Sequence, residues 1–477
     1  MKRERRKPSA WYSISVLLGV LAIVLCGKVF FGAGLATMFL LSWLFIFPAC
    51  MRLGFSYEEI EAGVLSYIDR GMEAILIVLA VGGMIASWMA AGTVPAIICY
   101  GLELIRPKSF LLISFLLCTA VAYICGTSWG TMGTAGIAMF AVGESLGVPA
   151  ACSVGAIFSG AYLGEMASPM SNSANVCASA CGVPLNRHCL EAGLMLLPVM
   201  GITAVLYFFL SRSQGGGLDS SYIESTCAAL SGLFRIDLLD FLPVLFLLGL
   251  IAAKIPALFS MLISAVFACV LAVVRQGAAA SDILAIFWSG YEVESGSDFL
   301  DALLNRGGVE SMFETGAVML FSFGMAGAFQ AAGLLDPLVE ALTRRTKGVL
   351  QLGIATEGMT VLGNMLGTNT FALIMTGSLM KDTYESFRLA PTDLSRTMTA
   401  SSTVFCPLIP WNVSGLYIVA LYGIECLDFA PYAFCAYLTP LFALFFLCFR
   451  LRSACTEEGR RSPSYASPAA APSRRKR

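Results

Sequence analysis

The sequence predicts an all-α polytopic membrane protein of about 11 to 14 transmembrane helices, in two repeats with broken helices at the bilayer midplane. Three observations predict this fold. Of the 477 residues, 57% are apolar and 13% are charged, whereas about 25% are charged in an ordinary soluble domain. Apolar runs that suit membrane helices recur along the chain. Polar stretches containing glycine and proline interrupt these runs in the same order in each half.

Both ends of the chain are basic. The positive-inside rule therefore predicts that both termini are cytoplasmic, which requires an even number of crossings. No small-residue cleavage site follows the apolar stretch after Trp11, so we interpret that stretch as a retained first helix. Residues 1–10 are a basic cytoplasmic N-terminus, and residues 453–477 are a disordered cytoplasmic tail. We expect a multi-pass protein of the plasma membrane or cell inner membrane.

The apolar segments form a first transmembrane half, residues 11–210, and a second half, residues 238–452. A glycine-containing linker at 211–237 joins them. An acidic amphipathic segment at 57–69 predicts a surface helix before the third span. Several segments are shorter than the roughly 20 residues of a full crossing, as expected where a helix breaks midway. In order along the chain, the predicted apolar segments cover residues 11–31, 35–50, 74–89, 110–125, 135–146, 151–163, 190–210, 238–253, 256–274, 316–333, 349–366, 371–380, 398–413 and 433–449.

Four polar breaks interrupt the apolar segments. The first half has breaks at residues 126–133 and 164–175, and the second half has them at 363–370 and 401–414. Irregular backbone at membrane depth must be buried in protein or line a cavity. Paired broken helices therefore indicate a transporter's binding site. If each half has an odd number of crossings, the repeats are inverted and the four breaks meet near the midplane.

Glu165 is the foremost candidate for chemistry. A charge at the bilayer centre costs about 2.5 to 3.5 kcal/mol on translocon scales, so an intramembrane carboxylate indicates a functional site. Glu165 follows Gly164 and precedes Pro169, which predicts that it faces an unwound segment. A carboxylate there can hold either a proton or a hard cation, and competition between them would couple the two fluxes. The alternative is a carboxylate that caps a helix at the membrane surface.

Oxygen-bearing side chains cluster at the same four breaks. Such groups suit Na⁺ and other hard cations, although a single Ser or Thr in an apolar helix more often bonds its own helix. The candidates beside Glu165 are Ser168, Ser171, Asn172, Asn175, Thr127, Ser128, Thr368, Asn369, Thr403 and Asn412. We expect transient Na⁺ binding at Glu165 and no tightly bound metal.

Other ionisable and cysteine residues rank lower. Glu357 is a possible second buried carboxylate, and Glu73 is expected to open a helix, where its charge favours the dipole. His188 is the one histidine of the chain and is expected in a solvated loop. Many of the 16 cysteines stand alone in apolar runs, where they act as small hydrophobes. No catalytic constellation, nucleotide-binding loop, cofactor site or nucleic-acid site is indicated, so we do not expect an enzyme.

The ordered segments resemble the NhaC-type Na⁺/H⁺ antiporter family of the ion transporter superfamily, from about residue 57 to residue 422. The most specific stretch, residues 155–169, reads GAIFSGAYLGEMASP; residues 87–95 read SWMAAGTVP and residues 407–412 read PLIPWN. The resemblance implies Na⁺/H⁺ exchange. Three positions depart from the family's usual pattern. Glu165 and Asn172 each replace an aspartate, and a further aspartate is replaced near Thr368 or Asn369. Two fewer acids would weaken affinity for a bare cation.

We therefore predict a secondary active transporter, with Na⁺/H⁺ antiport by alternating access as the first hypothesis. The alternative is an H⁺- or Na⁺-coupled exchanger of small organic anions or amino acids, as in the family's malate/lactate exchangers. Neutral Asn and Ser sites and helix N-termini, which favour carboxylates, make that alternative physically reasonable. A passive channel fits two repeats around one site less well. The expected partners are membrane lipid and either Na⁺ with H⁺ or a small organic solute. Assembly into a homo-oligomer is left as an open alternative.

Overall fold

The computed structural model describes residues 5–214, 220–294, 301, 304–305, 307–334, 337, 346 and 348–449. Within these residues all regular secondary structure is helical, which confirms the all-α class. Each predicted apolar segment contains a helix. The helices are α1 Ala10–Phe31, α2 Leu35–Arg52, α3 Tyr57–Ala90, α4 Thr93–Leu104, α5 Phe110–Cys125, α6 Ser128–Thr131, α7 Ile137–Ser145, α8 Ala150–Ala167, α9 Asn172–Cys181, α10 Leu185–Gln214, α11 Ser220–Leu233, α12 Leu242–Ala252, α13 Ala257–Leu271, α14 Ala280–Ser289, α16 Phe313–Ala331, α18 Val349–Leu366, α19 Asn369–Ser386, α20 Pro391–Phe405, α21 Val413–Tyr422, α22 Cys426–Phe429 and α23 Phe434–Cys448.

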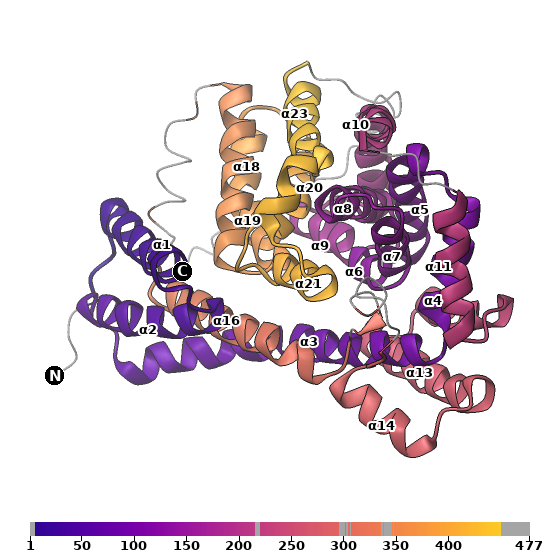
Figure 1. Cartoon of the computed structure of the whole chain (residues 1–477). Helices are drawn as coiled ribbons and strands as arrows, with labels where there is room; N and C mark the ends of the chain where they lie inside the picture. Colours follow the sequence, from indigo (N-terminus) through magenta and orange to yellow (C-terminus); the bar gives the residue numbers. More distant parts are fainter. Residues whose placement is uncertain are drawn as a thin grey trace, which may run out of the picture.

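Helix α3 organises one layer of the molecule, drawn along the bottom of Figure 1. It is 34 residues long and begins with a capping box, in which Ser56 Oγ accepts a hydrogen bond from Glu59 N. Helices α2, α13, α14 and α16 pack against it. The predicted surface helix at 57–69 is therefore wrong as a separate element. Buried residues at helical spacing, Ile60, Val64 and Tyr67, continue the α3 core face through it.

A second layer, at the top of Figure 1, combines helices from both predicted halves. Helix α8 packs against α5 and α10, while α20 contacts α9, α10, α18, α19 and α23. A buried ion cluster fixes α20 in place: Arg396 donates to Glu191 of α10 at 3.3 Å and to Asp393 at 3.0 Å. The division into halves at residues 210 and 238 stays a prediction, and so does the inverted repeat.

Helices α5 and α8 approach each other closely at two glycines. A Cβ atom at Gly160 would lie 2.4 Å from Phe115 O, and a Cβ atom at Gly164 would lie 2.4 Å from Thr119 O. These glycines are four residues apart, so they share one face of α8 and form the small-residue contact common between membrane helices. The contact sets the position of Glu165, the residue that follows Gly164.

Several helices can cross a membrane. Among the described residues, six helices are long and apolar enough, and two bent helix pairs raise the number to eight. These helices confirm a multi-pass membrane protein. The number is below the predicted 11 to 14 because the predicted segments include broken helices, which are short or carry polar residues. Helix α7, for instance, spans 9 residues.

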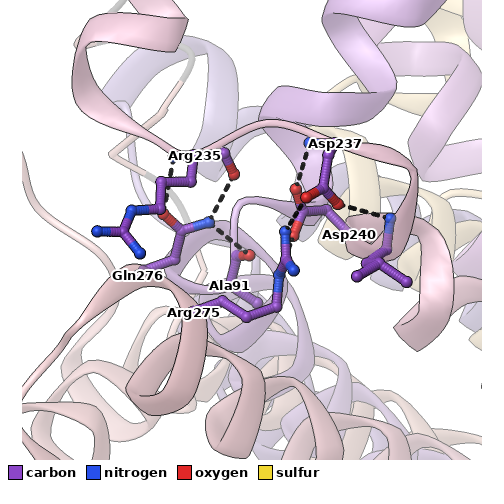
Figure 2. A network of polar contacts seen from close by, with 7 residues as sticks. Ala91, Arg235, Asp237, Asp240, Arg275 and Gln276 are labelled. Carbon is purple, nitrogen blue, oxygen red and sulfur yellow. Dashed lines mark hydrogen bonds and ion pairs between the residues drawn. The ribbon is translucent and has the colours of Figure 1, made fainter.

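The predicted linker at 211–237 is helical over much of its described part. Helix α10 extends to Gln214, and α11 packs on α4. After α11, the chain is tied to the end of the α13 segment by the polar network of Figure 2. Gln276 Nε2 donates to Ala91 O at 3.2 Å and to Arg235 O at 3.0 Å. Arg275 forms ion pairs with Asp237 and Asp240, the latter at 3.1 Å. The predicted disordered tail, residues 453–477, lies outside the described residues.

We expect Arg275→Ala to lower thermal stability markedly. Asp240 is fully buried, and removing the partner of a buried charge costs about 3 to 5 kcal/mol. The hydrogen bond from Arg275 also lowers the pKa of Asp237. The stabilisation of the folded state by this ion pair is therefore present at neutral pH and is lost as pH falls through the lowered pKa of Asp237. The measurement is the unfolding midpoint of detergent-purified protein.

Arg5→Ala is the matched control for Arg275→Ala, because it breaks the exposed pair with Glu59 and should change stability by less than about 1 kcal/mol. Equal midpoints for the two variants would show that Asp240 does not depend on Arg275.

Candidate functional site

Each of the four breaks contains the start of a helix, and a predicted site residue caps that helix. Thr127 Oγ1 accepts from Gly130 N at 3.3 Å, and Ser171 Oγ accepts from Ala174 N at 3.2 Å. In the second half, Thr368 Oγ1 accepts from Phe371 N at 3.2 Å, and Asn412 Oδ1 accepts from Ser414 N at 3.0 Å. These caps explain why Ser, Thr and Asn concentrate at the breaks, since such residues satisfy the free N–H groups of a helix start.

Glu165 lies near the end of α8 and accepts hydrogen bonds from two neighbouring breaks. Its Oε2 accepts from the backbone N–H of Ser128 at 3.1 Å. Its Oε1 accepts from Ser173 Oγ at 2.6 Å and from Ser171 Oγ at 3.2 Å. The carboxylate therefore joins the start of α6 to the start of α9, and three donors compensate its charge.

A cavity of about 460 Å³ brings the four breaks together. The predicted residues that line it are Thr127, Ser128, Glu165, Asn172, Thr368, Asn369 and Asn412. Residues from both predicted halves thus face one space, as expected for breaks that share a site. The remaining predicted residues lie elsewhere.

Four predicted residues do not line the cavity. Ser171 is buried and donates to Glu165 Oε1 at 3.2 Å. Ser168 is buried and accepts from Met170 N at 3.2 Å. Asn175 donates to Ser171 O at 2.8 Å and lines a separate pocket between α9 and α19. Thr403 is buried within α20.

The side chain of Asn412 connects the two breaks of the second half by hydrogen bonds. Its Nδ2 donates to Asn364 O at 2.7 Å and to Gly367 O at 2.9 Å, and its Oδ1 accepts from Cys406 Sγ at 2.9 Å. These bonds satisfy carbonyls that α18 leaves free where it ends. Asn412 therefore shapes the wall of the cavity with a side chain whose polar atoms already have partners.

The second half also fixes the first break directly. The rings of Trp129 and Tyr417 stack with centroids 4.4 Å apart, and Tyr417 Oη donates to Trp129 O at 3.0 Å. Tyr422 Oη donates to Met132 O at 2.8 Å, within the π-helical turn that joins α6 to α7. Single π-helical turns are frequent at functional sites.

The cavity also contains charged and aromatic residues that sequence reasoning did not select, including Arg70, Glu73 and Tyr162. The prediction that Glu73 opens a helix is wrong, because Glu73 lies inside the continuous helix α3. Arg70 and Glu73 are three residues apart and share a face of that helix. The spacing of Arg70, Glu73 and Ile77, three and four residues apart, was the available signal for this face.

His188 differs from its predicted setting. It lies in α10, is fully buried, and its Nδ1 is 3.1 Å from Ser395 Oγ of α20. The predicted solvated loop is wrong because α10 begins at Leu185, so His188 packs in the first turn of a helix.

Comparison with known proteins places this architecture in a family. A model of the Na⁺/H⁺ antiporter family matches residues 160–451, which include Glu165 and three of the four breaks. The chain belongs to the Na⁺/H⁺ antiporter family. This confirms the resemblance drawn from the sequence motifs. The matched region also covers both breaks of the second half.

Relatives of this antiporter-family chain include transporters of several named substrates. The Malate-2H(+)/Na(+)-lactate antiporter of Bacillus subtilis is 33% identical over 88% of this chain and 91% of its own. The Na(+)/H(+) antiporter NhaC of Alkalihalophilus pseudofirmus is 30% identical over 84% of this chain and 87% of its own. The Arginine/ornithine antiporter ArcD of Halobacterium salinarum is 28% identical over 91% of each.

Proposed function

We propose that this protein is a secondary active transporter that exchanges Na⁺ for H⁺ by alternating access. The observation that carries the proposal is the position of Glu165, a carboxylate on the wall of a cavity that residues of all four breaks line. Broken helices from two halves around such a residue are typical of carriers that rock around a fixed site. Family membership supports the same conclusion.

Competition at Glu165 provides the coupling. Na⁺ is a hard cation that takes oxygen ligands, and Glu165 Oε1 lies beside the hydroxyl oxygens of Ser171 and Ser173. Both hydroxyl groups can rotate to present lone pairs in place of hydrogens. A proton on the same carboxyl group removes the negative charge that attracts Na⁺. One face of the membrane then loads Na⁺ and the other loads H⁺, so neither ion crosses without the other.

A second candidate function is exchange of a small organic anion or amino acid coupled to H⁺ or Na⁺. Arg70 lines the cavity, and arginine is suited to bidentate binding of a carboxylate. The cavity volume of about 460 Å³ falls within the range of small-molecule sites. Two of the relatives carry names of organic substrates.

We further propose that the protein lies in the plasma membrane or cell inner membrane with both termini in the cytoplasm. The basic residues at the two ends of the chain support this orientation. The long apolar helices imply contact with membrane lipid, and the homo-oligomer stays a prediction.

The test is dissipation of a pH gradient in proteoliposomes that contain the purified wild-type protein. We expect Na⁺ or Li⁺ to collapse the gradient and K⁺ to have little effect. If no cation acts but malate, lactate, arginine or ornithine does, the organic-solute hypothesis replaces the first. Empty liposomes with the same ion additions are the control for leakage.

A further inference from the structure

Helix α18 carries a second carboxylate, outside the cavity that contains Glu165. Glu357 lies in the middle of α18 and is partly buried. Its Oε1 is buried and has no hydrogen-bond partner in the part of the chain that the structure describes. A buried oxygen without a donor is costly to an ionised carboxylate. An ionisable residue within a membrane helix indicates a functional site.

A row of polar side chains extends along α18 from Glu357 toward the cavity wall. Thr360 and Asn364 follow Glu357 at helical spacing on α18, so the three share one face. Thr360 Oγ1 is 2.6 Å from Ser401 Oγ on α20. Asn364 Nδ2 donates to Ser402 O at 2.7 Å. We call the residues Glu357, Thr360, Asn364, Ser401, Ser402 and Asn369 the polar seam.

The polar seam ends in the cavity. Ser402 Oγ donates to Asn369 Oδ1 at 2.6 Å, and Asn369 lines the same space as Glu165. Within the described residues, Asn364 Oδ1 is buried and also lacks a partner. The seam thus contains two oxygens without donors, one of them a carboxylate. A purely structural polar network would be expected to satisfy its members.

The neighbours of Glu357 do not neutralise it. Tyr384 of α19 faces this region, with its Oη 3.1 Å from Thr356 Oγ1. Asp393 of α20 is already paired with Arg396 at 3.0 Å. Helix α23 meets α18 with Leu444 and Leu447 beside Gly353. Among the described residues, no cationic side chain forms an ion pair with Glu357.

We propose that Glu357 is a second proton-binding site of the transport cycle, linked to the cavity by the polar seam. The inference rests on the proposed exchange function and adds a residue to it. The two carboxylates have different roles because they have different hydrogen-bond partners. Glu165 has three donors, which suit a carboxylate that awaits a cation, whereas Glu357 Oε1 has none, which suits a carboxylic acid. The O–H bond of Glu357 breaks to release H⁺ and forms again when H⁺ returns, and no other bond changes.

A second proton site changes the number of protons exchanged for each Na⁺. The experiment holds a fixed Na⁺ gradient across proteoliposomes of the full-length protein and finds the pH gradient at which net exchange stops. We expect Glu357→Gln to halve the number of protons per Na⁺ and to remove the response of exchange to an imposed membrane potential. Glu385→Gln, an exposed position on α19, is the matched control and should keep the wild-type ratio.

The outcomes separate this inference from the proposed function. If the wild type exchanges no Na⁺ for H⁺, the proposed function fails. If the wild type exchanges but Glu357→Gln keeps its ratio, only the second proton site is overturned. If Glu357→Gln does not fold, the wild-type protein alone tests the proposal. A wild-type exchange rate that does not change with the imposed membrane potential overturns it. Glu357→Asp, which retains a carboxyl group, is expected to keep the wild-type ratio; a halved ratio there also overturns it.

Discussion

Glu165→Gln is expected to abolish ion-coupled exchange while the protein still folds and inserts. Glutamine has the shape of glutamate but no charge, so it neither attracts Na⁺ nor exchanges a proton at neutral pH. Its carbonyl oxygen can still accept from Ser171 and Ser173. Its NH₂ group then faces the N–H of Ser128, and this donor–donor contact costs about 1 to 3 kcal/mol. We expect exchange to fall to the level of empty liposomes, with a modestly lower unfolding midpoint.

Two comparisons make this result specific to the site. Glu103→Gln changes an exposed glutamate of α4 and should leave exchange unchanged. Ser173→Ala removes the shortest hydrogen bond to Glu165, at 2.6 Å, and should weaken exchange without abolishing it. Wild-type rates in a folded Glu165→Gln protein would remove Glu165 from the mechanism.

The breaks were predictable from the sequence because their signals are local. A helix that stops and restarts needs a residue that can leave the helix and a side chain that can cap the next one. Gly126 supplies the first with a φ of +69°, and Thr127 supplies the second. The same chemistry recurs at Ser171, Thr368 and Asn412. Residues placed by these signals consequently lie around one cavity.

Other features depend on contacts between distant segments, which composition does not reveal. The sequence predicts Asn412 to be a free oxygen ligand. Its side chain instead donates hydrogen bonds to carbonyls more than 40 residues away, at the end of α18. The sequence predicts Glu73 to open a helix, because the acidic start of α3 resembles a separate surface helix that ends before it. Only the packing of α16 and α13 along the whole of α3 shows that this segment continues past the cavity.

The contact between α5 and α8 predicts a large effect on folding from the smallest substitution. Gly164→Ala places a Cβ atom 2.4 Å from Thr119 O, so the two helices must separate or bend. Overpacking of this kind costs about 1 to 3 kcal/mol, and it acts beside Glu165. We expect a clearly lower unfolding midpoint and a loss of exchange, because the carboxylate shifts relative to Ser128 and Ser173.

Gly201→Ala provides the matched control for Gly164→Ala. Gly201 also lies within a long helix, α10, but a Cβ atom there would meet nothing within 4 Å. Alanine favours a helix over glycine by about 1 kcal/mol, so this variant should be as stable as the wild type or more stable. The opposite signs of the two glycine substitutions distinguish close packing from helix propensity. Equal midpoints would mean that α5 and α8 are farther apart in the membrane, and that Glu165 owes its position to its hydrogen bonds alone.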